Sequence, residues 1–134
     1  MIRYLLDTNA FSHALKGTLS TFSDRFTAVA LEDVAVSVIT EAELLFGLAR
    51  RPKAHELSRA VHELLGRITI LPWTPEAAEQ YARLRFALET QGQPIGAMDL
   101  MIAAHALAED AVLVTNDAAF RRIERLKLED WTHA

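Results

Sequence analysis

Short apolar segments alternate along the chain with longer segments in which apolar residues recur at helical spacing. The short segments are rich in Val, Ile and Leu, which is typical of strands buried on both faces of a parallel sheet. They are residues 2–6, 34–38, 68–71 and 111–114. Helical spacing predicts helices at residues 10–15, 18–31, 40–48, 54–65, 75–89, 97–108 and 118–125, and a last short segment lies at 128–131. This alternation predicts an α/β domain with a central parallel sheet covered by helices, but not the order of its strands.

Four acidic residues fall at junctions between these elements and their connections. Asp7 follows the first strand, and Glu43 lies in the first turn of the helix after the second. Asp99 opens the helix before the fourth strand, and Asp117 follows that strand. Right-handed crossovers bring the carboxyl ends of parallel strands to one edge of the sheet. The first, second and fourth of these acids can therefore converge there, whereas Asp99 joins them only if the fold brings its helix start across.

A cluster of four carboxylates is stable only where protons or metal ions offset its repulsion. Two carboxylates about 5 Å apart repel by roughly 3 kcal/mol at an effective dielectric constant of 20. Oxygen ligands in a chain without cysteine suit Mg²⁺ or Mn²⁺ better than zinc. The chemistry indicated is metal-assisted hydrolysis of a phosphodiester.

Each acid also has a purely structural explanation. Either Asp7 or Thr8 can cap the helix that follows. Thr40 and Glu43 have the spacing of a capping box, in which the Glu side chain bonds back to the N-cap amide. Asp99 suits the first turn of a helix, and Asp117 suits a turn. These explanations treat the acids one at a time and do not account for their recurrence at strand ends.

Length and composition predict one soluble domain over residues 1–134. Hydrophobic residues make up 51% of the chain, which is typical of a globular protein. No apolar segment approaches the roughly 20 residues that cross a bilayer, and no signal peptide precedes Asp7. We therefore expect a cytoplasmic protein without a membrane partner.

The charge balance is ambiguous about nucleic acid. A net charge of −4 counts against it, but acids that a metal neutralises contribute to that total. Two basic clusters remain, each of which is either a solvated face or a binding surface. They are Arg50, Arg51 and Lys53, and Arg121, Arg122, Arg125 and Lys127.

The other candidate residues favour structural roles. His105 lies six residues after Asp99, about 240° around the same helix, and so faces elsewhere. We expect it to be a structural or surface residue. Trp73 and Trp131 are expected to pack against other side chains and not to stack on bases.

Five motifs along the chain are similar in order and spacing to those of the PIN-domain ribonucleases, and within them to the VapC toxins of bacterial toxin–antitoxin pairs. The motifs are Leu6-Asp7-Thr8-Asn9, Ser37-x-x-Thr40-x-x-Glu43-Leu44-x-x-Gly47, Gly92-Gln93-Pro94-Ile95-Gly96-x-x-Asp99-x-x-Ile102-Ala103, Val114-Thr115-Asn116-Asp117 and Leu128-Glu129-Asp130-Trp131. The third motif looks like that of VapC members associated with initiator tRNA. Together the motifs span nearly the whole chain.

The resemblance implies a three-layer α/β/α PIN-like domain with a central parallel sheet and an acidic pocket that binds Mg²⁺ or Mn²⁺. It implies an endoribonuclease toxin with an RNA substrate, a tRNA being one candidate, a cognate antitoxin and a homodimer. Asp7, Glu43 and Asp99 match the family's first three acids, and we expect the first and third to be direct metal ligands. Ser37, Thr40 and Asn9 match polar residues near the pocket.

The chain departs from the resemblance at the fourth acid. Relatives often have an acid directly before the phenylalanine that is Phe120 here, where this chain has Ala119. Asp117 is the available substitute and completes the expected catalytic set, with Asn116 competing for the same place.

Two other function classes remain as alternatives. Haloacid-dehalogenase phosphatases, which are metal-dependent phosphohydrolases, also have an Asp after the first strand, but they need a second Asp where this chain has Asn9. The non-enzymatic alternative is a phosphoacceptor receiver or an interaction module, and a receiver needs paired acids near the first strand and a lysine after its last strand. The late lysine of this chain, Lys127, is far from the predicted strand ends.

Overall fold

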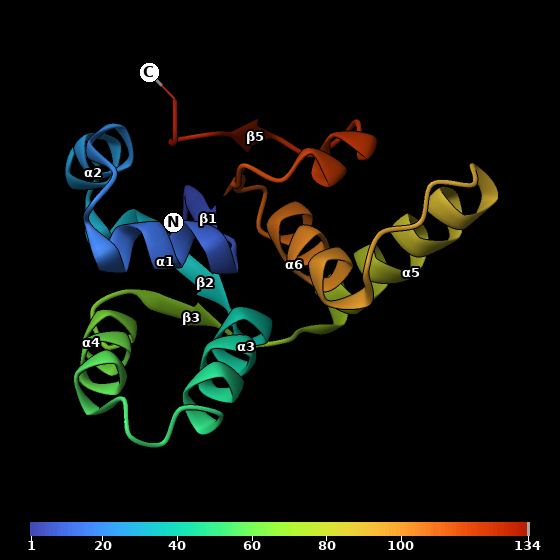
Figure 1. Ribbon diagram of the computed structural model, residues 1–134. Coiled ribbons are helices and arrows are strands. Elements are labelled where there is room, and N and C mark those ends of the chain that lie inside the picture. The colour runs from blue at the N-terminus through green and yellow to red at the C-terminus, as the bar shows by residue number, and fades with distance from the viewer. Residues whose placement is uncertain (134) are drawn as a thin grey trace.

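The computed structural model describes residues 1–133 and contains a five-stranded parallel sheet in the order β3-β2-β1-β4-β5 (Figure 1). The strands are β1 (Tyr4–Leu6), β2 (Val34–Ser37), β3 (Thr69–Leu71), β4 (Val112–Val114) and β5 (Leu128–Glu129). β1 lies in the middle, where Leu5 pairs with Ala35 of β2 and with Leu113 of β4. The first stretch of the chain is therefore enclosed on both sides by later strands.

Within residues 1–133, six α-helices and two short 3₁₀ helices surround the sheet (Figure 1). They are α1 (Thr8–Lys16), α2 (Ser20–Thr27), η1 (Leu31–Asp33), α3 (Val38–Ala49), α4 (His55–Leu65), α5 (Pro75–Thr90), α6 (Ala97–Ala108) and η2 (Ala118–Arg122). In Figure 1, α1, α2 and α4 lie on one side of the sheet, and α5 and α6 lie on the other.

Alternation along the strands divides the core between the two faces. Leu5 packs with Leu84 of α5 and Leu100 of α6. Its neighbour Leu6 packs on the opposite face, in a cluster with Phe11 of α1. Because successive side chains of a strand point to opposite faces, both sides of the sheet are covered by apolar contacts. The expected three-layer α/β/α architecture is confirmed.

Local signals fix several element boundaries. Thr74 accepts a hydrogen bond from the Ala77 N–H and so caps α5, with Pro75 at its first position. α6 has the bounds that its apolar pattern predicts. The helix expected to run to residue 31 instead ends as α2 at Thr27, and the chain then forms η1.

The segment near the C-terminus differs most from its pattern. Its expected helix at 118–125 is the 3₁₀ helix η2, and two residues of the last short segment form β5 beside β4. A strand of two residues is too short to show a period in the sequence. Within residues 1–133, no helix is both long and apolar enough to cross a membrane.

Candidate active site

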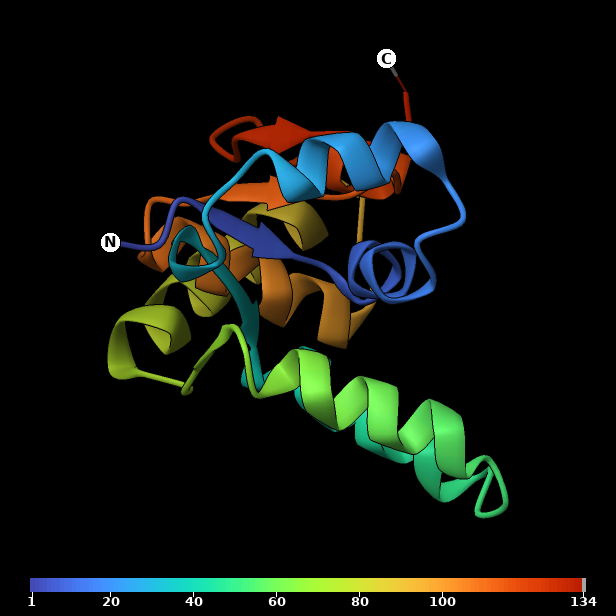
Figure 2. The same ribbon diagram turned by 90° about the vertical axis from the view of Figure 1, so that its left-hand side faces the viewer.

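The carboxyl ends of the three central strands form one edge, which presents polar residues. Leu6, the last residue of β1, lies level with Val36 and Val114. The Asp7 N–H then donates to the Val114 carbonyl across 3.1 Å. Helix α1 begins directly after β1 at this edge (Figure 2), and α3 begins directly after β2. The sheet therefore brings together the residues that follow β1, β2 and β4.

Asp7 caps α1 and also belongs to the acidic cluster. Its Oδ1 accepts a hydrogen bond of 2.7 Å from the Ala10 N–H. The side chain is only 5% exposed, and this burial raises the pKa of its carboxyl above the ordinary value. The Thr115 hydroxyl and the Ala10 N–H lower the pKa, whereas the charges of Asp99 and Asp117 raise it further. The capping explanation is therefore confirmed, and as a cap the Asp7 carboxyl still lies near the charges of Asp99 and Asp117.

Glu43 is held by a hydroxyl from the neighbouring helix. The Thr8 Oγ1 donates a hydrogen bond of 2.6 Å to Glu43 Oε1. The capping-box interpretation is wrong, because α3 begins at Val38 and its N-cap is Ser37, whose Oγ accepts from the Ile39 N–H. Glu43 therefore lies in the second turn of α3 and not in the first. Its carboxylate reaches across to α1 and does not close its own helix terminus.

Asp99 reaches the same edge from the start of α6. It is half-buried in the first turn of that helix. Burial raises the pKa of its carboxyl, and the charges of Glu43 and Asp117 raise it further. Asp99 thus interacts electrostatically with Glu43 and Asp117, and Asp7 interacts with Asp99 and Asp117. The helix start thus crosses to the strand ends, as the site interpretation requires.

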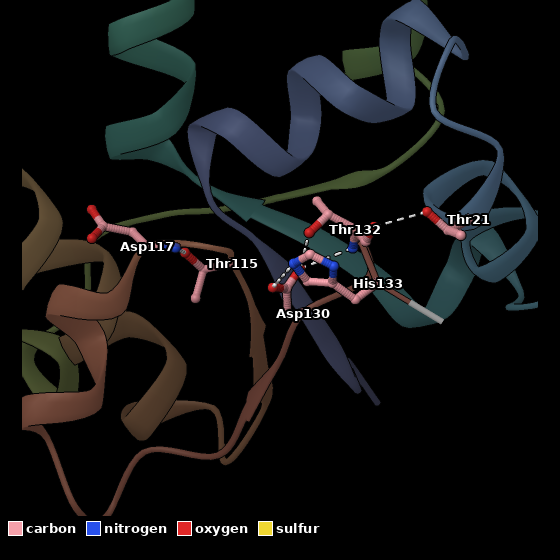
Figure 3. Close-up of polar contacts among 6 residues, drawn as sticks. All are labelled: Thr21, Thr115, Asp117, Asp130, Thr132 and His133. Carbon is pink, nitrogen blue, oxygen red and sulfur yellow. Dashed lines mark hydrogen bonds and ion pairs between the residues drawn. The ribbon is translucent and has the colours of Figure 1, made fainter.

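Asp117 is the most exposed of the four acids. Its N–H donates to the Thr115 hydroxyl, and its Oδ1 accepts from the Ala119 N–H, so that it caps η2 (Figure 3). Figure 3 shows its carboxylate pointing away from Asp130, which instead binds Thr132. The neighbouring Asn116 is exposed as well. Asp130 therefore belongs to a separate network near the C-terminus.

The carboxylates suit a hard divalent cation by their chemistry. Within residues 1–133, no three His, Asp or Glu side chains come close enough as they stand to surround a metal ion. Even so, Asp7 and Asp99 both have raised pKa values, first through burial and then through neighbouring negative charge. A cation offsets both causes, and hard oxygen donors are the ligands that Mg²⁺ and Mn²⁺ prefer. The donor set therefore fits such an ion, provided that side chains turn toward it.

A buried histidine ties α6 to the start of α3. His105 Nδ1 lies 2.6 Å from Ser37 Oγ, and Nε2 lies 2.9 Å from the Pro72 carbonyl oxygen. Because a carbonyl only accepts, Nε2 carries the proton and the Ser37 hydroxyl donates to Nδ1. The imidazole is 1% exposed, so the structural alternative is confirmed and the surface alternative is wrong. Through this contact His105 fixes the helix that carries Glu43 against the helix that carries Asp99.

The protonation of His105 gives a testable pH dependence. Burial lowers its pKa in the folded chain, although the Pro72 carbonyl and Glu109 oppose that shift. As the pH falls below about 6.5, the unfolded chain therefore binds a proton that the folded chain does not, and the free energy of unfolding decreases. We expect His105→Gln to lower stability by about 1–3 kcal/mol at pH 7, through the altered buried hydrogen bonds. We also expect a shallower decrease between pH 7 and 5.

Urea unfolding at both pH values measures this difference. His55→Gln, at an exposed position of α4, is the matched control and should keep the wild-type slope. A His105→Gln protein with the wild-type slope would contradict the assignment of the pH dependence to this residue.

Hydroxyl groups around the acids are the feature that sequence reasoning missed. The sequence suggests Thr8 as an N-cap or motif residue, but in the structure its hydroxyl binds Glu43 and lies 3.5 Å from the buried Thr40 hydroxyl. Thr115 contacts both Asp7 and Asp117. Thr8 directly follows Asp7 and Thr115 lies two residues before Asp117, and this proximity in the sequence is the signal that could have identified both hydroxyl groups. Trp131 is buried as expected, and Trp73 packs edge-on against Tyr81 and His105 while remaining 37% exposed.

The family model of the PIN domain matches residues 4–126 of the chain. The chain belongs to the PIN-domain family. Ribonuclease VapC2 of Rickettsia felis is 35% identical over 130 residues, covering 96% of this chain and 97% of that protein. The tRNA(fMet)-specific endonuclease VapC of Shigella flexneri is 33% identical over 134 residues, covering 98% of this chain and 100% of that protein.

Solved structures agree with the PIN-domain assignment. The DNA-bound VapBC complex of Salmonella typhimurium contains a chain that superposes with a TM-score of 0.90 at 30% identity, covering 98% of this chain and 99% of that one. The VapBC2 complex of Rickettsia felis, bound to a promoter DNA fragment, contains a chain with a TM-score of 0.87 at 35% identity. That superposition covers 96% of this chain and 98% of the other.

Proposed function

We propose that this chain is a metal-dependent endoribonuclease that acts as the toxin of a toxin–antitoxin pair. The observation that carries the proposal is that, at the carboxyl edge of the sheet, the charges of Asp99 and Asp117 act on Asp7 and those of Glu43 and Asp117 act on Asp99. Relatives named as VapC ribonucleases support RNA as the substrate, and the tRNA(fMet)-specific relatives support a tRNA in particular. The PIN-domain match favours this function over a dehalogenase-type phosphatase or a receiver module.

Two of the acids would hold the metal ion, and other groups orient the carboxylates. Asp7 and Asp99 would hold Mg²⁺ or Mn²⁺, and such an ion when bound polarises phosphate and water for hydrolysis. The Ala10 N–H fixes one oxygen of Asp7, and the Thr8 hydroxyl fixes one oxygen of Glu43. His105 holds α3 and α6 together beneath them. The chain thereby orients its carboxylates before substrate arrives, which lowers the reorganisation needed during reaction.

A cleavage assay with and without metal tests the proposed function. Purified protein is incubated with bulk tRNA in Mg²⁺, in Mn²⁺ or after treatment with EDTA. We expect cleavage in the first two conditions, and a return of activity when metal is added back after EDTA. Equal activity in EDTA would reject the metal dependence, and no cleavage of any RNA in either metal would reject the nuclease.

The assembly partners form part of the same proposal. The Salmonella and Rickettsia neighbours were solved as toxin–antitoxin complexes, which supports an antitoxin for this chain. We propose that a basic or amphipathic segment of that antitoxin reaches the acidic edge and neutralises it. An enzyme that cleaves tRNA acts where tRNA is found, so the proposal places the chain in the cytoplasm.

We further propose a homodimer that forms through α3. The sequence suggests a dimer surface of apolar residues on the third and fifth helices, namely Leu44, Leu48, Leu84 and Leu88. Leu84 and Leu88 cannot contribute to it, because both are buried in the core. By contrast, Leu45 is 41% exposed and Phe46 is 62% exposed on α3. Light scattering at high micromolar concentration should give a dimer, and Phe46→Asp should give a monomer, because a charge in an apolar interface is strongly unfavourable. Phe86→Asp, which alters an exposed aromatic residue of α5, is the control, and a strictly monomeric wild-type chain would reject the dimer.

Asp117 is expected to contribute less than the two metal-binding acids. It is exposed and already caps η2, so its carboxylate acts at the margin of the cluster. Asp117→Asn keeps the cap and removes the charge. We expect the cleavage rate to fall by about tenfold, as is common for groups that support a metal site indirectly.

The Asn116→Ala variant shows whether Asn116 or Asp117 supplies the fourth polar group of the site. If Asn116→Ala loses activity and metal affinity while Asp117→Asn cleaves RNA and titrates metal like the wild type, the fourth polar position belongs to Asn116.

A further inference from the structure

A basic cavity lies beside the acidic edge, between the C-terminal half of α5 and the segment that contains η2. Its volume is about 580 Å³. Six polar side chains that line it are Arg83, Gln91, Gln93, Arg121, Arg122 and Arg125. Among the described residues of the lining, Glu124 is the acid that opposes these arginines. In a chain with a net charge of −4, this is a local concentration of positive charge.

The arginine charges are largely free to meet a ligand. Arg122 donates to the Pro94 carbonyl and Arg125 to the Gln80 amide oxygen, both of which are neutral acceptors. Among residues 1–133, no ion pair within 4.0 Å involves Arg121, Arg122 or Arg125. Arg83 pairs with Glu79, but both side chains are 63% exposed, and such pairs are weak. The contacts therefore position guanidinium groups without neutralising most of them.

One arginine of this cavity lies close to the acidic edge along the chain, because Arg121 follows Asp117 by four residues through η2. Arg121 also lines a smaller cavity of about 180 Å³ together with Asn116, Asp117 and the acids Glu129 and Asp130. A 3₁₀ helix rises about 2.0 Å per residue, so the four residues from Asp117 to Arg121 span only about 8 Å. A few nucleotides cover that length. A strand whose scissile phosphate lies at the acids can thus place a neighbouring phosphate at Arg121.

We propose that this cavity binds backbone phosphates of the RNA strand that flanks the scissile bond. The inference rests on the proposed function, and it adds a positioning site for the substrate outside the four acids. Planar guanidinium groups bind phosphate through two parallel hydrogen bonds, and Gln91 and Gln93 add amide donors. Phe86, 74% exposed and three residues from Arg83 on α5, offers a ring on which a base can stack.

The first test measures RNA binding without cleavage. In an Asp7→Asn background, fluorescence anisotropy follows a labelled single-stranded RNA of about 20 nucleotides, which is longer than the contacts of a typical single-strand site. The double variant Arg83→Gln with Arg125→Gln removes two cavity charges. We expect about tenfold weaker binding and a salt dependence shallower by about 1.4, because each single-strand phosphate contact contributes about 0.7 to the slope.

A matched control distinguishes the cavity from overall charge. Arg59→Gln with Arg67→Gln removes two exposed charges in and after α4. This control should bind within about twofold of the parent, because screening limits the reach of surface charges to roughly 10 Å. Equal weakening in both double variants overturns the proposal, as does unchanged binding in the cavity variant. Circular dichroism melting confirms that each protein is folded.

The second test separates the cavity from the catalytic proposal. With Asp7 restored, a dinucleotide offers the scissile phosphate alone to the acidic edge, whereas the longer RNA also reaches the cavity. The cavity variant should lose about tenfold in kcat/KM on the long RNA and stay unchanged on the short one. If the wild type cleaves neither RNA, the proposed function is wrong. The binding experiment in the Asp7→Asn background still shows whether the cavity binds RNA. If the cavity variant loses the dimer while its RNA binding stays intact, the cavity is a protein-docking surface and the proposal is overturned.

Discussion

The Asp7→Asn and Asp99→Asn proteins should cleave RNA at least about a hundredfold more slowly than the wild type. Groups that merely support metal ligands are commonly worth 10- to 100-fold, so a direct ligand should reach or exceed that range. Both substitutions keep the side-chain shape, and Asn serves as an N-cap as well as Asp, so α1 should be unaffected at Asp7. A single-turnover cleavage assay in Mg²⁺ measures the loss.

The same variants should be as stable as the wild type, or more stable, when metal is absent. Burial and neighbouring charge raise the pKa of both carboxyls in the folded chain. The unfolded chain therefore releases these protons at lower pH than the folded chain, and the free energy of unfolding falls as the pH rises through the raised values. The stability advantage of the Asn variants should appear at neutral pH and vanish below about pH 4, where both states are protonated.

Metal binding provides an independent measurement on these proteins. Mg²⁺ should raise the melting temperature of the wild type, because a ligand that binds only the folded state stabilises it. This increase should be small or absent in either Asn variant. Asp24→Asn, at an exposed position of α2, is the control and should respond like the wild type. Wild-type cleavage by both Asn variants in Mg²⁺ would show that the metal site is misplaced.

Glu43→Gln should give a folded protein with about a hundredfold lower activity. Its amide oxygen can still accept from the Thr8 hydroxyl, so the contact between α1 and α3 persists while the charge is lost. Thr8→Val keeps the charge and removes the hydroxyl that orients it, so a smaller loss of about tenfold is expected. Cleavage rates and melting curves of the two variants, measured together, separate charge from orientation.

Glu41→Gln is the matched control for this prediction, because Glu41 lies on the same helix in its first turn. Its rate should stay within about twofold of the wild type, as is usual for a surface substitution away from a site. An active Glu43→Gln protein beside an unstable Glu43→Ala protein would leave Glu43 with a structural role alone.

Local patterns in the sequence determined most of the elements and the positions of the four acids along them. Thr74 and Pro75 predict the start of α5, because Thr is a favoured N-cap residue and Pro is favoured at the first helical position. The spacing of apolar residues predicts α6 from residue 97 to 108. Asp7 and Asp117 follow strands in any parallel arrangement of this chain. Such features depend on hydrogen bonds and periodicity within a few residues, so they can be inferred without knowing what packs where.

Only the tertiary structure decided the order of the strands and which groups touch the acids. The capping box at Thr40 and Glu43 fits every local rule, yet Ser37 caps α3 and Glu43 turns to Thr8, which lies 35 residues away in sequence. His105 likewise meets Ser37 across 68 residues. Local chemistry leaves several partners possible for such side chains. The choice among them follows from which faces the sheet buries and which helices it brings together, because burial requires each polar group to find a partner there.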